Sequence, residues 1–277
     1  MQLLEFSIPF DSELNYLVNI HTFLKTAKKS DSSLSYRINL RLKERTLSGC
    51  DAVVINRRNV ILNNTRFHNV MDELLLETSK VQDELVLDIN PSGSIRRIRN
   101  MKAIRKKWDE IKTGVYSAYR GDTVKQFLAP MEKIIDSEES FIAALSRDPF
   151  YRFFPDIYGE YGEYGRTDNN KLYREGYVSD FITVKQAKYK VRETGRLTRL
   201  ESGGYEIMTA IDIDKAHMEL IKNQLSALYA TDGIPEVSMQ CRHVLSSDKQ
   251  ITSVNSSQKL LWNEDLQKSI TMQINKC

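Results

Sequence analysis

The sequence has few cysteines, few chain-breaking residues and no strong excess of one charge. Its 277 residues include three cysteines, 12 glycines and six prolines, and 40 basic and 37 acidic residues give a net charge of +3. The cysteines (Cys50, Cys241 and Cys277) are odd in number and form no CxxC pair, which favours a reducing compartment over a disulfide scaffold. The balanced charge excludes an overall field that would attract nucleic acid or an anionic membrane, so a basic partner site would have to be local.

Long hydrophobic runs are also lacking. The longest, such as residues 52–55 and 74–76, are far shorter than the roughly 18 to 20 residues that span a bilayer, which predicts no transmembrane segment. The first ten residues contain no Lys or Arg and already reach Pro9, so they do not have the pattern of a signal peptide. We therefore expect a cytoplasmic protein, although a secreted protein that had lost its leader would have the same sequence.

The apolar residues that are present suffice for a folded core. Hydrophobic residues make up 41% of the chain, and their periodicity predicts both helices and strands. Leu14, Leu17, Val18, His21 and Leu24 fall on one helical stripe, which predicts a helix over residues 12–29. Residues 34–43 alternate strictly between apolar and polar side chains, which is typical of a strand with one buried face.

The same reasoning predicts the remaining elements. We expect strands at residues 50–56, 59–63, 85–89, 94–99, 181–192, 196–201, 205–213, 236–245, 251–262 and 266–275. We expect helices at about residues 68–79, 100–119, 122–133, 137–146 and 214–229, with Asn100, Ser137 and Asp214 as N-caps and Trp108 buried on the apolar stripe of the second of these helices.

The order of these elements is similar in the two halves of the chain, each with strands, one helix and closing strands. We therefore predict an α+β fold with two curved antiparallel β-sheets or half-barrels packed on a central group of helices. The predicted organisation is one compact two-lobed unit over residues 1–277. It comprises an N-terminal β lobe with flanking helices (1–99), central helices (100–155), a Gly- and Tyr-rich loop (156–176) and a C-terminal β lobe with one helix (177–277).

One stretch resembles a known group of proteins. The segment Asp88-Ile-Asn-Pro-Ser-Gly-Ser-Ile-Arg-Arg-Ile-Arg-Asn100, followed by a Trp-bearing helix, resembles uncharacterised bacterial half-barrel proteins that are distantly similar to the LolA-type lipoprotein carriers. The resemblance covers about 25 residues and implies a concave sheet that holds an apolar group or a partner. The leader typical of those exported carriers is not found in this sequence.

Two clusters carry side chains that could do chemistry. Asp212 and Asp214, with His217 three residues later, could gather around a divalent metal, but Asp214 stands where a helix N-cap belongs, so we predict no metal site. Cys241 and His243 share a face of a predicted strand, as a thiolate and its base would. No third group is placed beside them, and a core cysteine next to a packed histidine is the simpler interpretation.

Two other segments are candidate contact surfaces. A run of cations could bind phosphate, although nearby acidic residues can neutralise much of it; the candidate basic patch comprises Arg96, Arg97, Arg99, Lys102, Arg105 and Lys106. The Gly-rich segment of residues 158–165 carries tyrosines that no helix or strand aims inward, which favours a protein-binding surface formed by Tyr158, Tyr161, Tyr164 and Arg166. The alternative is that Tyr161 and Tyr164 fold back over the core.

Taken together, the residues indicate a non-catalytic protein with no cofactor and no metal. We predict a protein-binding or assembly component, such as a subunit of a larger bacterial complex or a chaperone or immunity-type protein, with a protein as partner rather than nucleic acid. The alternative is a carrier that holds a lipid or another apolar ligand between a curved sheet and the central helices. A metal-dependent enzyme built on Asp212, Asp214 and His217 is the third hypothesis.

Overall fold

The computed structural model describes residues 12–26, 29–45, 51–63, 70–90, 94–153, 171–179, 188–230, 232–263 and 266–277. These residues belong to two compact units. The first unit is drawn from Val18–Ser33 and Tyr161–Lys276, and the second from Ile8–Leu17, Leu34–Glu160 and Cys277. The strands over residues 13–25 and 29–45 therefore contribute residues to both units.

The second unit contains an antiparallel sheet. Its strands are β1 (Glu13–Lys25), β2 (Lys29–Arg45), β3 (Asp51–Leu62), β4 (Glu84–Ile89) and β5 (Ile95–Ile98). The order across the sheet is β5-β4-β3-β2, with the start of β1 beside β2. Leu40 of β2 lies opposite Ile55 of β3, and both side chains are buried. The predicted strand at 34–43 is confirmed as part of β2, and the segments predicted at 50–56 and 59–63 form one continuous strand, β3.

The helix predicted over residues 12–29 is wrong, because Glu13–Lys25 form strand β1. Leu14, Tyr16, Val18 and Ile20 are buried, while the residues between them are exposed or half-buried. The segment therefore fits period two as well as the helical period. Its aromatic and β-branched residues favour the strand, in which they pack on a pleated surface.

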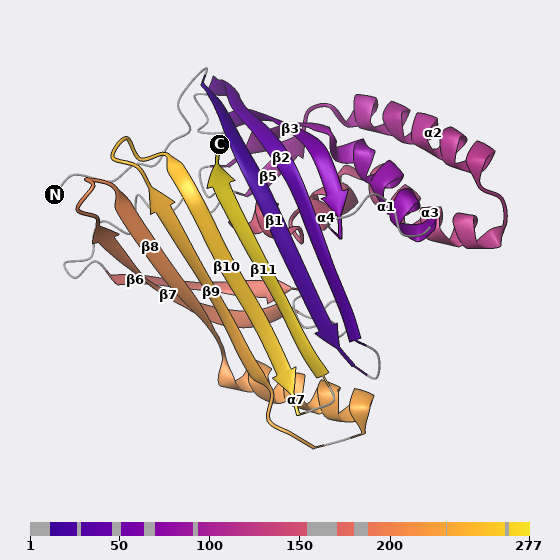
Figure 1. Cartoon of the computed structure of the whole chain (residues 1–277). Coiled ribbons are helices and arrows are strands. Elements are labelled where there is room, and N and C mark those ends of the chain that lie inside the picture. The colour runs from indigo at the N-terminus through magenta and orange to yellow at the C-terminus, as the bar shows by residue number, and fades with distance from the viewer. Residues whose placement is uncertain are drawn as a thin grey trace. The chain divides into compact units, whose positions relative to one another are not determined.

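Two of the helical segments of the second unit lie between β3 and β4, and the other four follow β5. They are α1 (Val70–Ser79), the 3-10 turn η1 (Lys80–Gln82), α2 (Met101–Ala118), α3 (Asp122–Asp136), α4 (Glu138–Leu145) and α5 (Pro149–Phe153). Helix α2 lies beside α3 (Figure 1), and Arg105 of α2 donates a 2.8 Å hydrogen bond to the carbonyl oxygen of Asp136. The predicted apolar stripe of α2 is confirmed, since Met101, Ile104, Trp108 and Val115 are buried. Ser137 caps α4 as predicted, through a 3.2 Å bond from the Ser140 N–H.

Asn100 does not cap α2 with its side chain. Its Oδ1 accepts a 2.9 Å hydrogen bond from the Val86 N–H, and its Nδ2 donates to the carbonyl oxygen of Glu84 at 2.9 Å. Both partners belong to β4. The side chain therefore satisfies backbone groups of the neighbouring strand and fixes the start of α2 against it.

The first unit is an antiparallel sheet with one long helix. Besides the parts of β1 and β2 within Val18–Ser33, its strands are β6 (Lys171–Ser179), β7 (Lys188–Arg199), β8 (Tyr205–Ile213), β9 (Glu236–Leu245), β10 (Ile251–Trp262) and β11 (Leu266–Lys276), in the order β11-β10-β9-β8-β7-β6. The strands predicted for β8 to β11 are confirmed. Strand β7 joins parts of the two strands predicted at 181–192 and 196–201, and residues 171–176 of β6 fall within the loop predicted at 156–176.

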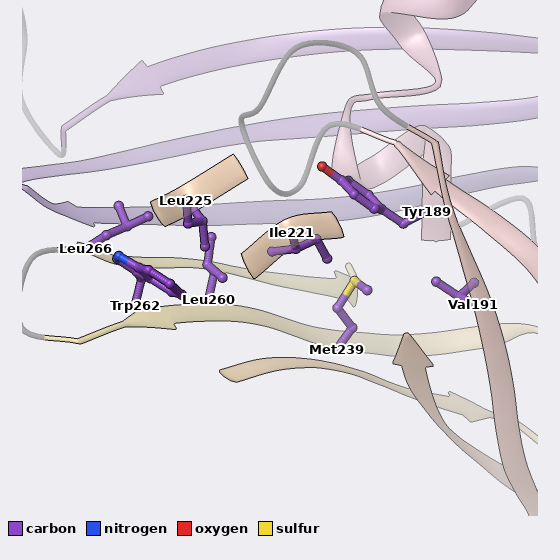
Figure 2. Close-up of a cluster of buried hydrophobic side chains, with 8 residues drawn as sticks. All are labelled: Tyr189, Val191, Ile221, Leu225, Met239, Leu260, Trp262 and Leu266. Carbon is purple, nitrogen blue, oxygen red and sulfur yellow. The ribbon is translucent and has the colours of Figure 1, made fainter. Parts of the chain in front are cut away.

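Helix α7 (Lys215–Tyr229) covers one face of this sheet. Ile221 and Leu225 point from the helix into a buried cluster on the strands (Figure 2). The strand members of this cluster, Tyr189, Val191, Met239, Leu260 and Trp262, are joined by Leu266 at the start of β11. Burying a side chain of this size stabilises the fold by about 1.5 to 3 kcal/mol, so the cluster fixes α7 to the sheet.

The α+β class and the antiparallel pairing of the strands are therefore confirmed. Packing of two half-barrels on a central group of helices stays a prediction. Within the residues that the structure describes, no helix is both long and apolar enough to cross a membrane.

Candidate functional site

The sheet of the first unit carries a hollow of about 780 Å³ across four neighbouring strands. Its lining comes from β7 (Thr194, Gly195, Arg196), β8 (Met208, Thr209, Ala210), β9 (Gln240, Cys241, Arg242) and β10 (Asn255, Ser256, Ser257). Antiparallel pairing places these twelve residues in three rows that run across the strands. Residues 50 or more positions apart in the sequence therefore meet at one place.

The alternation of side chains assigns the rows to the two faces of the sheet. The middle row is Gly195, Thr209, Cys241 and Ser256, and its last three side chains are buried. They lie on the same face as Met239 and Leu260, which pack against α7. The two outer rows point to the opposite face, where most of their side chains are exposed. The hollow thus lies on the face of the sheet opposite α7, with the backbone of the middle row as its floor.

The outer rows differ in chemistry. One row, Thr194, Ala210, Gln240 and Ser257, is small or uncharged. The other row places Met208 between Arg196 and Arg242, with Asn255 at its end. Met208 is 52% exposed. The hollow therefore combines an apolar contact with two cations.

The two arginines have different surroundings. Arg242 binds the carboxylate of Glu206, with Nε and Nη2 at 2.7 Å and 2.5 Å from its Oε1. For Arg196, the described part of the chain provides no ion-pair partner. Among the described residues that line the hollow, Arg196 is thus a cation without an ion-pair partner, beside an exposed methionine.

The opposite face holds the predicted pair Cys241 and His243. The Cys241 Sγ lies 3.5 Å from the His243 Nε2, and both residues are buried. Glu193, Thr209, Ser256 and Gln258 are further polar residues on this buried face. The prediction that the pair shares a face is therefore confirmed. Because both side chains are buried, the thiol does not have the access that a nucleophile needs.

The Asp212, Asp214 and His217 cluster has the predicted geometry of a helix start. The Asp214 side chain accepts a 2.9 Å hydrogen bond from the Ala216 N–H and so caps α7, while Asp212 is exposed at the end of β8. The His217 Nδ1 lies 3.8 Å from the Asp214 Oδ1. Among the described residues, no three His, Cys, Asp or Glu side chains are grouped as metal ligands.

The candidate basic patch lies on β5, on α2 and, with Arg99, in the turn between them, and acidic partners neutralise part of it. Arg99 forms 2.6 Å ion pairs with Asp88 and with Glu44, and these contacts raise its pKa. Arg105 is bound to carbonyl oxygens at the end of α3. The other members, Arg96, Arg97, Lys102 and Lys106, are exposed. Tyr158, Tyr161, Tyr164 and Arg166 lie outside the described residues, so the predicted partner-binding loop stays a prediction.

The residues of the hollow were not singled out from the sequence. Their alternation was visible, but strand order and register cannot be derived from one sequence, and these two properties bring Arg196, Met208 and Arg242 together. The available signal was the placement of Met208 among the outward-facing residues of a predicted strand.

Comparison with known proteins gives no family for this chain. No family model and no curated protein matches it. Among solved structures, lipovitellin, described for its lipid–protein interactions, has a TM-score of 0.49 at 6% identity, and the match covers 98% of this chain and 25% of that chain. DynF, from the dynemicin biosynthesis pathway of Micromonospora chersina, has a TM-score of 0.21 at 7% identity, with coverage of 99% and 85%. The chain thus spans a quarter of the lipovitellin chain, and at these scores neither structure assigns it a function.

Proposed function

We propose that this protein is a non-catalytic binding protein that holds a small apolar or amphiphilic ligand in the hollow on the sheet of the first unit. The observation that supports this most is the volume of about 780 Å³, which lies within the roughly 300 to 1,000 Å³ typical of small-molecule sites. This proposal follows the carrier hypothesis, with one change. It places the ligand on the sheet face opposite α7 instead of between a sheet and the central helices.

The proposal is tested with a neutral fluorescent apolar probe, N-phenyl-1-naphthylamine. We expect saturable binding to the full chain, because the probe loses contact with water when it enters the hollow. Ala210→Phe should weaken binding by about tenfold or more, a difference of about 1.4 kcal/mol, since the new ring occupies space inside the hollow.

The matched control is Ser238→Phe. Ser238 is exposed on the same face of β9, two residues from Gln240, and does not line the hollow. It should bind the probe as the parent does. Absence of saturable binding to the parent, or equal binding by the parent and Ala210→Phe, would rule the proposal out.

A protein-binding role is the second candidate, and an exposed apolar surface on the second unit supports it. Val70, Met71 and Leu75 of α1 and Tyr116 of α2 are each more than 40% exposed. The two helices are connected, since the Tyr119 hydroxyl donates a hydrogen bond to Glu73. A photocrosslinker at Leu75 should capture one defined partner, and Met71→Glu should abolish that capture. A crosslinker at the exposed Lys125 of α3 is the control; equal capture from both positions would count against the surface.

A further inference from the structure

We infer that the ligand of the hollow is an amphiphile with a carboxylate headgroup, which Arg196 binds, and an alkyl chain that lies over Met208 and Ala210. This inference rests on the proposed function and adds the chemical class of the ligand. It follows from the charges and apolar groups that the pairing of β7, β8 and β9 brings together.

The first step concerns the spacing of the cations. Arg196, Met208 and Arg242 are consecutive partners across three antiparallel strands. Neighbouring strands lie about 4.8 Å apart, so the backbones of the two arginines are separated by about 10 Å. The long side chain of Arg196 can therefore reach a headgroup placed between the two arginines, from which the tail continues over Met208.

The second step concerns the net charge. The row supplies two cations, and Glu206 supplies one anion that binds Arg242 through two nitrogens. Glu206 thus holds the Arg242 guanidinium in one orientation and neutralises it. Arg196, with no ion-pair partner among the described residues, supplies the one remaining positive charge among these three side chains. A ligand with one negative charge would balance Arg196, Arg242 and Glu206 together.

The third step concerns the type of anion. A guanidinium presents two parallel N–H groups that match the two oxygens of a carboxylate, and it is less strongly hydrated than an ammonium group. Uncharged donors at the same hollow, from Asn255, Gln240 and Thr194, can complete the hydrogen bonds of a carboxylate oxygen.

The fourth step concerns the tail. Met208 is unbranched and polarisable, which suits contact with a flexible alkyl chain. Ala210 lies two residues further along β8 on the same face, so the chain can continue from Met208 over a small side chain without obstruction. An inorganic anion would leave this apolar part of the hollow unused.

The test compares dodecanoate with dodecanol, which has the same tail and no charge, in displacement of N-phenyl-1-naphthylamine at pH 8 below micellar concentrations. We expect dodecanoate to bind about tenfold more tightly than dodecanol, with an advantage that decreases as salt is added. Acetate, the headgroup without a tail, should not displace the probe. Arg196→Gln should remove the difference between dodecanoate and dodecanol, and Arg196→Lys should retain part of it.

Arg192→Gln is the matched control. Arg192 lies on the same face of β7 but outside the hollow, opposite Asp212, so this variant should keep the preference for dodecanoate. Equal binding of dodecanoate and dodecanol to the parent would overturn the inference and leave the proposed function standing. Retention of the preference by Arg196→Gln would also overturn it. If the parent binds neither ligand nor the probe, the proposed function fails and the inference fails with it.

Discussion

The Sγ of Cys241 lies 3.5 Å from the Nε2 of His243, and both side chains are on the buried face of β9. Cys241 is 4% exposed and His243 is 1% exposed, whereas Cys277 at the end of the chain is exposed. Reaction of a thiol with an alkylating reagent requires an accessible thiolate. We therefore expect iodoacetamide to label Cys277 in the native protein and Cys241 only after unfolding.

Peptide mass spectrometry after timed labelling at pH 8 measures both rates in one sample, with Cys277 as the internal control. If native Cys241 reacts within about tenfold of the Cys277 rate, the thiol is accessible and activated, and the catalytic interpretation of the Cys–His pair would have to be reconsidered.

Trp108 is buried on α2, and its Nε1 is a buried donor without a hydrogen-bond partner among the described residues. Trp108→Ala should cost about 3 to 5 kcal/mol of unfolding free energy, because it removes buried apolar surface and leaves a cavity. Trp108→Phe should cost much less, since it keeps most of the ring contacts and removes an unsatisfied donor. Urea unfolding followed by circular dichroism compares the two. Equal losses in both variants would indicate that the Nε1 has a partner.

Helices and strands were predicted correctly from the sequence where the apolar residues followed only the helical period or only the strand period. The stripe of α2 and the alternation of β2 each fit a single pattern, and both elements are observed. The apolar residues of 13–25 fit both the helical period and the period of two that a strand has. The strand forms because neighbouring strands pair with this segment, and that pairing exists only in the folded chain. Residues 193–195 lie between two segments predicted as separate strands, and pairing with β6 and β8 keeps Gly195 within the single strand β7.

The candidate site could not be predicted in the same way. Arg196, Met208 and Arg242 are each unremarkable in their own segments. They form a candidate site only because they are adjacent across β7, β8 and β9. A register shift of one residue in any of these strands would move its residue to the other face of the sheet. Cys241 and His243 were found because their spacing of two lies within a single strand.

Tyr36 and Tyr151 should make the second unit less stable at alkaline pH. Both are buried, and burial, with a smaller contribution from the Asp148 carboxylate, raises the pKa of each hydroxyl. Unfolded tyrosine ionises at about pH 10. Below that pH both hydroxyls keep their protons in the folded and in the unfolded chain, and the full stability is present. Above it the hydroxyls ionise in the unfolded chain while the folded chain still holds them protonated, which stabilises the unfolded chain. The free energy of unfolding should therefore fall as the pH rises above about 10.

Tyr36→Phe should reduce this loss, because phenylalanine has no proton to release in the unfolded state. Urea unfolding at a series of values from about pH 8 to pH 11 measures the slope. Tyr116→Phe, at an exposed position of α2, is the control and should retain the parent slope. Identical slopes for parent and Tyr36→Phe would mean that this hydroxyl ionises as readily in the folded protein as in the unfolded chain.

Gly204 of the first unit and Gly114 of the second have opposite surroundings, so replacing each with alanine should change the free energy of unfolding in opposite directions. Gly204 lies in the turn before β8, where its carbonyl oxygen accepts a 2.9 Å hydrogen bond from the Leu200 N–H, and a Cβ at this position would overlap with the carbonyl oxygen of Leu245. That oxygen belongs to the backbone of β9 and cannot rotate away as a flexible side chain could. We expect Gly204→Ala to cost about 2 kcal/mol or more, because the β8–β9 pair must separate locally to admit the methyl group.

Gly114 has the opposite surroundings and should respond with the opposite sign. It lies inside α2, and a Cβ there meets no atom within 4 Å. Because glycine inside a helix loses more backbone entropy on folding than alanine does, Gly114→Ala should stabilise the protein by about 0.5 to 1 kcal/mol. Urea unfolding of both variants followed by circular dichroism gives the two signs directly. If Gly204→Ala leaves the free energy of unfolding unchanged, the turn can shift away from β9 without cost. The close approach of Gly204 to Leu245 would then not be what fixes the β8–β9 register on which the hollow depends.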